Sequence, residues 1–221
     1  MPRTWVVVPV FNEATVIGSV VADLLASFPN VVCVDDGSSD SSAAEALSAG
    51  ATVIRHPINL GQGASLQTGF DFALADPHTT EVVTFDADGQ HQVADAVGMV
   101  AKLRLENLDI VIGSRFLDDR TEMTTLKRAT LRFAAFYTRV TTGLPLTDAH
   151  NGLRVLSRDL LEKIRVRQNR MAHASELIDQ IGASKATWAE YPTHIVYTEY
   201  SKAKGQSVLN SINILVELLF R

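Results

Sequence analysis

Two aspartates that follow a short apolar run could together bind a metal ion. Residues 82–85 are apolar or β-branched, and Asp86 and Asp88 follow with one small residue between them. In an extended segment, residues at i and i+2 point to the same side, so these two carboxylates would converge. Converging carboxylates repel each other unless a cation lies between them, and hard oxygen ligands favour Mg²⁺ or Mn²⁺. The alternative is a solvated turn after a strand, where Asp and Gly are common.

Similar polar or glycine-rich segments follow other short apolar runs, which are rich in β-branched residues and predict strands. These runs are residues 5–8, 31–34, 52–54, 82–85 and 110–112. Segments with helical spacing separate them, at about 14–27, 40–49, 62–75 and 92–105. Strands that alternate with helices predict an α/β fold with a mostly parallel sheet and helices on both faces. Ligands bind to such sheets at the carboxyl ends of the strands.

The pattern is less regular beyond residue 116. We expect helices at 124–142, 157–164 and 174–183, and strands at 153–156 and 187–197. The chain shows no internal repeat, no low-complexity stretch and no linker, so residues 1–221 are expected to form a single domain. We divide it into a first half (1–115), a second half (116–205) and a C-terminal apolar helix (206–221).

Composition is that of an ordinary globular protein. The chain has 221 residues, of which 46% are hydrophobic and 20% charged, and its formal net charge is −5. Because there is no overall basic field, we expect no nucleic-acid partner. The lone cysteine, Cys33, lies in an apolar run and cannot form an internal disulfide, which fits a reducing compartment. Without a signal-peptide pattern or roughly 18 consecutive apolar residues, we expect a cytoplasmic location.

The C-terminal segment is a candidate for contact with a membrane. Residues 206–221 are strongly apolar but too few to cross a bilayer, and Lys202 and Lys204 stand just before them. A basic patch followed by an apolar helix can lie on a membrane surface. We therefore expect contact with the inner face of the membrane or with a small membrane-protein partner. The alternative is a helix that packs on the domain itself or on a partner chain.

Five motifs occur in the order found in family-2 glycosyltransferases, which the chain resembles over roughly its whole length. They are Val7-Val8-Pro9-Val10-Phe11-Asn12-Glu13, Val34-Asp35-Asp36-Gly37-Ser38, Asn59-Leu60-Gly61-Gln62-Gly63, Asp86-Ala87-Asp88-Gly89-Gln90-His91 and Gly113-Ser114-Arg115-Phe116. The chain resembles in particular the dolichol-phosphate mannose synthase-like branch, which moves a sugar from a nucleotide to a polyprenyl phosphate. This implies a GT-A-type fold, with a Rossmann-like nucleotide-sugar-binding half in 1–115 and a smaller acceptor-side lobe in 116–205. The common dinucleotide and P-loop fingerprints are absent.

The resemblance implies a nucleotide-sugar site in the first half of the chain. Pro9 and Glu13 would line the nucleoside pocket. Asp35 would bind the base, and Asp36 would lie near the ribose. At Gly61 the backbone would approach the donor closely, because glycine has no Cβ.

The resemblance also assigns the metal and the diphosphate. Asp86 and Ala87 would contact the nucleotide sugar. Asp86, Asp88 and Gln90 would hold Mg²⁺ or Mn²⁺, with Asp88 as the direct ligand. The ion would neutralise the diphosphate as it leaves.

On the acceptor side, Arg115 and Arg128 would lie near the donor or acceptor phosphates, because a planar guanidinium suits phosphate oxygens. Asp148 would stand beside the acceptor, either to orient it or to act as a base. A phosphate acceptor is already an anion at neutral pH and does not require a base. Lys202 and Ser207 belong to a segment that would close over the donor diphosphate.

These observations favour an inverting, metal-dependent glycosyltransferase that uses a UDP- or GDP-linked sugar and a polyprenyl phosphate. One alternative is a soluble glycosyltransferase that acts on a saccharide or small-molecule hydroxyl. A nucleotidyltransferase is a further alternative, although its glycine-rich, basic first loop is missing. A non-catalytic sugar-nucleotide-binding protein would have little need of both Asp86 and Asp88.

Overall fold

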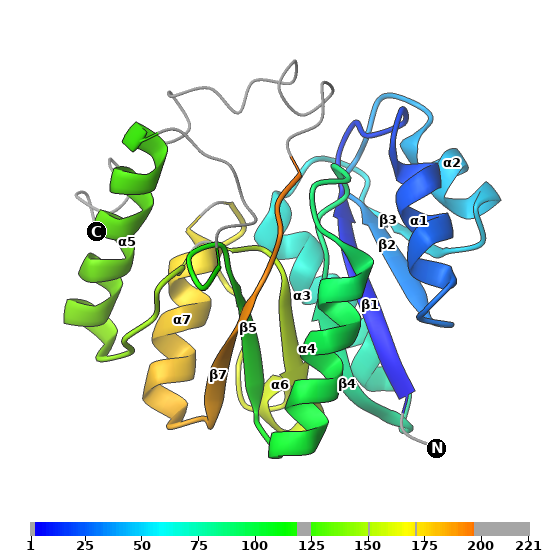
Figure 1. Cartoon of the computed structure of the whole chain (residues 1–221). Coiled ribbons are helices and arrows are strands. Elements are labelled where there is room, and N and C mark those ends of the chain that lie inside the picture. The colour runs from blue at the N-terminus through cyan, green and yellow to red at the C-terminus, as the bar shows by residue number, and fades with distance from the viewer. Residues whose placement is uncertain (1–2, 119–124, 150, 171, 197–221) are drawn as a thin grey trace.

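A computed structural model of the chain describes residues 3–118, 125–149, 151–170 and 172–196, and Figure 1 shows the arrangement of their helices and strands. The strands are β1 (Arg3–Val10), β2 (Val31–Asp35), β3 (Thr52–Arg55), β4 (Thr79–Thr84), β5 (Ile110–Ser114), β6 (Arg154–Ser157) and β7 (Trp188–Pro192). The helices are α1 (Ile17–Leu25), α2 (Ser42–Ser48), α3 (Gln62–Ala75), α4 (Val93–Glu106), α5 (Thr125–Thr142), α6 (Arg158–Leu161) and α7 (His173–Ser184).

The described strands form one mixed sheet in the order β3-β2-β1-β4-β6-β5-β7. All neighbouring pairs are parallel except those of β6, which runs antiparallel to both β4 and β5. The reason is the route of the chain: residues 147–149 and 151–153 lie at the carboxyl edge of the sheet, beside the end of β5, so β6 starts there and must run back. The expected mostly parallel sheet is therefore confirmed, with one reversed strand in its middle.

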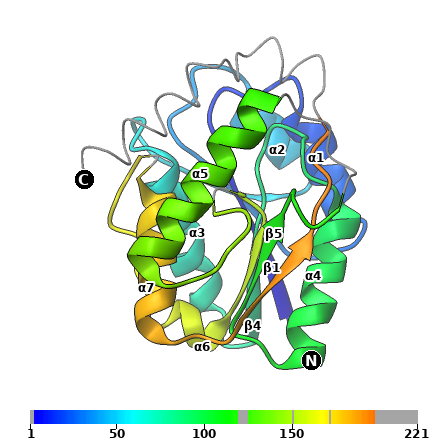
Figure 2. The ribbon, with the colours of Figure 1, turned by 60° about the vertical axis from the view of Figure 1, so that its left-hand side comes forward.

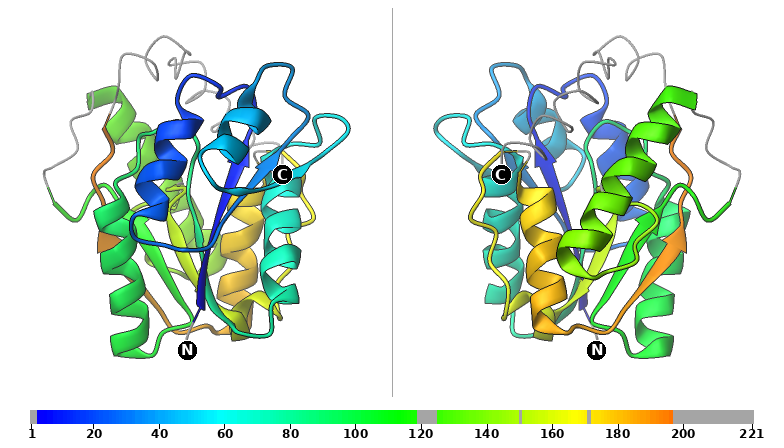
Figure 3. Two further views of the ribbon diagram at one scale, coloured as in Figure 1. Left: turned by 90° about the vertical axis from the view of Figure 1, so that its right-hand side faces the viewer. Right: turned by 90° about the vertical axis from the view of Figure 1, so that its left-hand side faces the viewer.

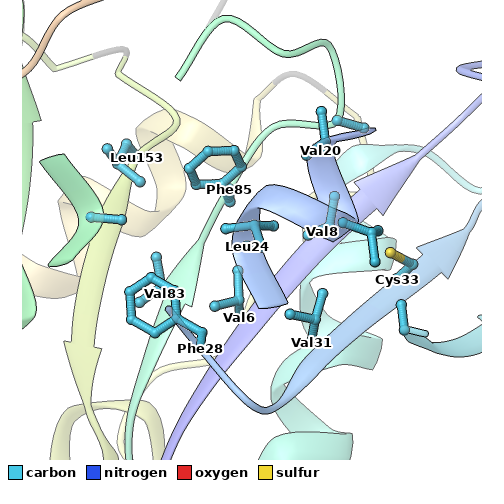
Figure 4. Packing of buried hydrophobic residues seen from close by; sticks show 14 of the residues in the cluster. Val6, Val8, Val20, Leu24, Phe28, Val31, Cys33, Val83, Phe85 and Leu153 are labelled. Atoms are coloured by element: carbon cyan, nitrogen blue, oxygen red, sulfur yellow. The ribbon is translucent and has the colours of Figure 1, made fainter. Parts of the chain in front are cut away.

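Helices cover both faces of the sheet, as predicted (Figure 3). Helices α1, α2 and α4 share one apolar cluster with the sheet, in which Leu24 and Phe28 pack over Val6 and Val83 (Figure 4). Helices α3, α6 and α7 share a second cluster on the opposite face. Helix α5 packs against α7 and so forms an outer layer on that side (Figure 2). Strands covered on both faces explain why their sequences are nearly continuous apolar runs.

The predicted elements are found, with shifts at their ends. Helix α1 begins at Ile17 rather than near residue 14, α6 covers only Arg158–Leu161, and β7 ends at Pro192 rather than near residue 197. Strand β1 continues through Pro9, which was expected to follow it. Proline is tolerated there because the register of β1 with β4 ends at Val7, so one side of β1 needs no N–H donor at Pro9.

The outcomes for Cys33, for the second half of the chain and for the C-terminal segment are as follows. Cys33 is fully buried, and burial raises the pKa of its thiol to about 12, so it behaves as a small hydrophobic residue as predicted. The residues of the expected acceptor-side lobe supply β6 and β7 to the same sheet as the first half. The expected C-terminal helix at 206–221 lies outside the described residues. Within those residues, no helix is long and apolar enough to cross a membrane.

Close packing of α3 on the sheet leads to a testable difference between two glycines. A Cβ at Gly69 would lie 2.2 Å from Cγ1 of Val7, whereas a Cβ at Gly18 in α1 meets nothing within 4 Å. We expect Gly69→Ala to lower the free energy of unfolding by about 1–3 kcal/mol, because β-branched Val7 cannot move aside cheaply. The control Gly18→Ala should raise it by up to about 1 kcal/mol through helix propensity. Urea denaturation measures both, and equal effects of the two variants would contradict this packing.

Candidate functional site

Polar side chains gather at the carboxyl edge of the sheet, which is the upper edge in Figure 1. They come from the ends of strands that are distant in sequence, and each follows or ends its strand except Asp148, which precedes the reversed strand β6. These residues are Glu13 after β1, Asp35 and Asp36 at the end of β2, Asp86 and Asp88 after β4, Arg115 after β5 and Asp148 before β6. The edge predicted to bind a ligand is therefore the edge where acidic and basic side chains meet.

Asp86 is held by three neighbouring segments of the chain. Its Oδ1 accepts a hydrogen bond from Nε2 of Gln62 (3.2 Å), and its Oδ2 lies 2.9 Å from Nε2 of His91. Gly152 passes directly behind it, because a Cβ there would come within 2.3 Å of Oδ2. Burial opposes ionisation of Asp86, but the hydrogen bond from His91 and the charge of Arg154 hold its pKa below the usual value. Asp86 is thus a fixed carboxylate whose side chain remains 32% exposed.

Asp88 carries the less stable of the two negative charges. Burial, followed by repulsion from Asp86, raises the pKa of Asp88 to about 6, and the charge of Glu13 adds to the rise. Gln90 donates to it through its backbone N–H (3.1 Å) and its side-chain amide (2.7 Å). The expectation that Asp86 and Asp88 lie in an extended segment is wrong, because residues 87–88 form a turn, but the two carboxylates do interact.

The chemistry of these side chains fits a hard divalent cation. A pair of repelling carboxylates gains stability when a cation neutralises it, and the side-chain oxygen of Gln90 is a further hard ligand. The described part of the chain contains no group of three or more His, Cys, Asp or Glu side chains that could hold a metal ion. An ion held by so few protein ligands keeps positions for water and phosphate oxygens, which is the usual way in which Mg²⁺ is bound.

Asp35 presents a buried oxygen that lacks a hydrogen bond. Its Oδ1 accepts from the backbone N–H of Ser38 (3.3 Å). Its Oδ2 lies 3.0 Å from Nε of Arg55, yet the N–H is not aimed at it, and among the described residues this oxygen has no hydrogen-bond donor. The Arg55 side chain is largely exposed and is anchored to the carbonyl of Ser38. A buried acceptor beside an exposed arginine is suited to receive an N–H group of a ligand.

Asp36 holds a loop of the protein itself. Its Oδ1 lies 2.8 Å from Nδ1 of His56 and accepts from the N–H of Leu60 (2.9 Å), and its Oδ2 accepts from the N–H of Gly61 (2.7 Å). The contact with a ribose that the resemblance implies remains a prediction. In the structure, this carboxylate organises the segment that leads into α3.

Gly61 is required by a contact within the protein. A Cβ at Gly61 would come within 2.2 Å of the carbonyl oxygen of Asn169, and its φ of 105° is one that other residues avoid. The same carbonyl accepts from the N–H of Gly63 (2.8 Å) and of Ala64 (3.4 Å) at the start of α3. The close approach expected here for a donor is thus made by the protein's own backbone, and a role of Gly61 in donor binding stays a prediction.

Arg115 and Asp148 form a bidentate ion pair. Nε of Arg115 lies 2.6 Å from Oδ2 of Asp148, and Nη2 lies 2.7 Å from Oδ1. Both side chains are nearly buried, with exposed fractions of 11% and 1%. This pairing, which the sequence did not predict, brings the two residues together and fixes the plane of the guanidinium. Their roles toward the phosphates and the acceptor remain predictions.

Arg154 is a buried cation to which sequence reasoning assigned no role, although it ends the segment Asp148–Arg154 that resembles an Asp-x-x-x-Gly-x-Arg pattern of the same branch. It is the largest fully buried side chain among the described residues, and its charge interacts with those of Asp86 and Asp148. Burial lowers the pKa of its guanidinium to about 10, while the two carboxylates oppose that fall. Its Nη2 donates to the carbonyl of Ala149 (3.4 Å), and its Nε has no described partner. The signal in the sequence was a charged residue inside the predicted strand 153–156, where a covered strand is otherwise apolar.

For the remaining predicted site residues, the structure gives a position and a degree of burial only. Pro9 is half-buried in β1, Ala87 is buried in the turn beside Asp88, and Arg128 is half-buried near the start of α5. Lys202 and Ser207 lie outside the described residues. Residues 193–196, which lead toward them, contact the loop that carries Asp86 and Asp88: the N–H of Val196 donates to the carbonyl of Gln90 (3.0 Å).

Comparison with known proteins gives four consistent findings. The model of the family "Glycosyl transferase family 2" matches residues 5–165. The chain is 35% identical to the uncharacterized protein MJ1222 of Methanocaldococcus jannaschii, over 98% of this chain and 91% of that protein. It is 28% identical to the UDP-N-acetylglucosamine–dolichyl-phosphate N-acetylglucosaminyltransferase of Methanococcus voltae, over 97% of this chain and 94% of that protein. The fold is similar to glucosyl-3-phosphoglycerate synthase from Mycobacterium tuberculosis in complex with Mn²⁺, UDP and phosphoglyceric acid, with a TM-score of 0.66 and 18% identity, over 99% of this chain and 79% of that chain.

The raised pKa of Asp88 has a consequence for stability. The folded protein binds a proton at Asp88 with a pKa of about 6, against 3.8 for the ordinary carboxyl, so its ionisation costs stability above that range. In metal-free buffer at pH 7, Asp88→Asn should raise the free energy of unfolding by on the order of 1 kcal/mol. The gain should shrink as the pH falls below about 6 and vanish only below the ordinary pKa of 3.8, where both states are protonated.

Urea denaturation with EDTA at several pH values measures this gap. The matched control is Asp71→Asn, an exposed carboxylate on α3, which should show no such pH-dependent gain. A wild type that is more stable than Asp88→Asn at pH 7, or a gap that does not change with pH, would contradict the repulsion between Asp86 and Asp88.

Proposed function

Because the chain belongs to glycosyl transferase family 2, we propose that it transfers a sugar from a UDP-linked donor to a polyprenyl phosphate, with inversion and with a divalent cation. The observation that carries this proposal is the interacting pair Asp86 and Asp88 at the carboxyl edge, which retains an uncompensated charge for a cation to neutralise. The relative from Methanococcus voltae, named for a UDP-linked donor and a dolichyl-phosphate acceptor, matches nearly the whole chain and supports the same substrate classes.

The geometry at Asp35 supports uracil as the base. Oδ1 is occupied by the N–H of Ser38, so Oδ2 is the oxygen left without a hydrogen-bond donor in the described structure. Uracil offers a single ring N–H between two carbonyls. The N–H matches the one free acceptor, Oδ2 of Asp35, and a carbonyl matches the cationic side chain of Arg55 beside it. Guanine would present two adjacent N–H groups and would use both carboxylate oxygens best. We therefore expect a UDP-linked rather than a GDP-linked donor.

Asp86, Asp88 and Gln90 would hold Mg²⁺ or Mn²⁺. When bound, the cation supplies charge neutralisation for the diphosphate leaving group. The contacts from Gln62 and His91 keep Asp86 oriented, and the two hydrogen bonds from Gln90 keep Asp88 turned toward the same loop. These residues orient the donor so that the anomeric carbon is open to attack from the opposite side.

On the acceptor side, Asp148 orients Arg115 and does not act as a base. Both of its carboxylate oxygens are bonded to the Arg115 guanidinium, and the side chain is almost fully buried. A polyprenyl phosphate is already ionised at neutral pH, so its oxygen can attack without losing a proton to the protein. Arg115 and Arg128 hold the phosphate groups, and one displacement inverts the anomeric centre without a covalent intermediate.

An exposed apolar face on α5 supports binding at the surface of a membrane, where such an acceptor resides. Phe133, Phe136 and Val140 occupy positions i, i+3 and i+7, and all three are exposed. The exposed side chains of Arg132 and Arg139 flank them. The opposite face of the helix is buried through Leu131 and Ala135, which leaves the phenylalanine face to an apolar surface with anionic head groups.

A transfer assay tests the substrates directly. Labelled UDP- and GDP-sugars are incubated with Mn²⁺ and a short polyprenyl phosphate in detergent, and label extracted into organic solvent is measured. We expect product from a UDP-linked sugar, and Asp88→Asn should lower the rate at least about a hundredfold because a cation ligand is lost. The control Asp71→Asn should keep the wild-type rate.

Two outcomes of this assay would redirect the proposal. Product on a soluble saccharide, with none on the lipid, would favour the soluble glycosyltransferase. Transfer that persists undiminished in EDTA would contradict the role given to Asp86 and Asp88.

Flotation with vesicles tests the α5 face. The full chain should bind vesicles that contain anionic phospholipid, and Phe133→Ser with Phe136→Ser should lower the bound fraction at least about tenfold, because burial of each phenylalanine contributes about 1.5–3 kcal/mol. Leu105→Ser, at a still more exposed apolar position on α4, is the control and should float as wild type. Unchanged flotation of the double variant would assign membrane contact, if any, to another segment such as 206–221.

A further inference from the structure

One oxygen of Glu190 gathers the polar groups of the turn that carries Asp148. Glu190 is half-buried on β7, the strand that pairs with β5. Its Oε1 accepts hydrogen bonds from the backbone N–H of Thr147 (2.8 Å), the hydroxyl of Thr147 (2.9 Å) and the backbone N–H of Asp148 (3.2 Å). Because unsatisfied N–H groups are costly away from water, this carboxylate determines where the turn lies.

The same hydrogen-bond network reaches the end of β5. Since the Thr147 hydroxyl donates to Glu190, its oxygen accepts from the hydroxyl of Ser114 at 2.6 Å. Ser114 in turn accepts from the N–H of Phe116 (3.2 Å), and Asp148 accepts from the N–H of Arg115 (3.2 Å). The turn before β6 is therefore hydrogen-bonded to the segment after β5 through Thr147 and through Asp148. Glu190 accepts hydrogen bonds from both of these residues.

A carboxylate is an expensive group for a merely structural cap at this place. Burial, together with the nearby charge of Asp148, raises the pKa of Glu190 above its ordinary value even though three hydrogen bonds oppose the rise. A neutral glutamine would accept the same bonds without repelling Asp148. What the carboxylate adds is strength, because hydrogen bonds to an ionised acceptor are roughly twice as strong as neutral ones.

We propose that Glu190 is a positioning residue for the transfer reaction, which fixes the guanidinium of Arg115 through the turn at Thr147 and Asp148. The inference rests on the proposed function, because it takes Arg115 to face the phosphate groups of the substrates. Glu190 touches neither substrate. Its removal loosens the turn, the bidentate pair then samples other geometries, and misplacement of one phosphate-binding group slows transfer.

The chain offers a matched control at the other end of the same two strands. There Oδ2 of Asp109 accepts the backbone N–H of Thr187 (2.7 Å) and its hydroxyl (2.9 Å), much as Glu190 accepts those of Thr147. Asp109 lies just before β5, far from the carboxyl edge. Asp109→Asn therefore removes a similar charge-assisted contact without touching the turn at Asp148.

Steady-state kinetics with a UDP-sugar and a short polyprenyl phosphate compare Glu190→Ala, Glu190→Gln and Asp109→Asn. We expect kcat/KM for the acceptor to fall about tenfold or more in Glu190→Ala and less in Glu190→Gln, with KM for the UDP-sugar unchanged within about twofold. Asp109→Asn should keep the wild-type kcat/KM even where its Tm falls as far. If Glu190→Ala does not fold, Glu190→Gln carries the same comparison.

Amide hydrogen exchange gives a readout that does not depend on transfer. In Glu190→Ala and Glu190→Gln, the amides of Arg115, Thr147 and Asp148 should exchange faster, while those around Thr187 stay unchanged; Asp109→Asn should show the reverse. Unchanged exchange at Arg115, or a kinetic loss that Asp109→Asn shares, would overturn the role of Glu190. If the wild type transfers no sugar, the proposed function fails, and faster exchange at Arg115 still decides the positioning.

Discussion

The carboxyl edge of the sheet depends on the charge of one buried guanidinium. Arg154 lies inside the protein, and its charge interacts with both Asp86, in the loop after β4, and Asp148, in the turn before β6. A buried cation is tolerated only when carboxylates compensate it. In turn, the His91 hydrogen bond and then the charge of Arg154 lower the pKa of Asp86 against the effect of burial. The two carboxylates belong to the proposed donor and acceptor sides, so a single side chain sets the electrostatic balance of both. Replacing Arg154 would remove this compensating charge from Asp86, whereas Asp148 would keep its ion pair with Arg115.

The reversed strand β6 is what brings this cation to the right place. Strand β6 lies between β4 and β5 and begins at the carboxyl edge, so its first residue, Arg154, enters the sheet directly beneath the loops that carry Asp86 and Arg115. A parallel strand in the same position would begin at the opposite edge and end at this one. The turn that precedes β6 also carries Asp148 and is secured by Glu190 from β7. The second half of the chain thus completes the site by inserting a strand into the sheet of the first half.

Sequence patterns predicted the elements and the edge of the sheet at which the polar residues meet, because both follow from local periodicity and from the apolar runs of covered strands. The resemblance to a family named Asp86, Asp88, Arg115 and Asp148, but it did not predict that the last two form an ion pair. No role could be assigned to Arg154 or Glu190 from the sequence, because their roles depend on which strands are neighbours. Strand order places β6 between β4 and β5, which no periodicity reveals. The same limit applies to Gly61, whose contact with Asn169 joins segments more than a hundred residues apart.

The carbonyl of Asn169 has an electrostatic consequence for the donor. The first N–H groups of a helix, together with its macrodipole, form a natural binding site for phosphate. In α3 two of these groups, those of Gly63 and Ala64, already donate to the carbonyl of Asn169. These two N–H groups are therefore not available to bind a phosphate. Gln62 at the same helix start adds no positive charge, and its amide is bonded to Asp86. The charge of a diphosphate must therefore be balanced by a bound cation and by arginine side chains, and the cation, unlike a helix dipole, can be exchanged during turnover.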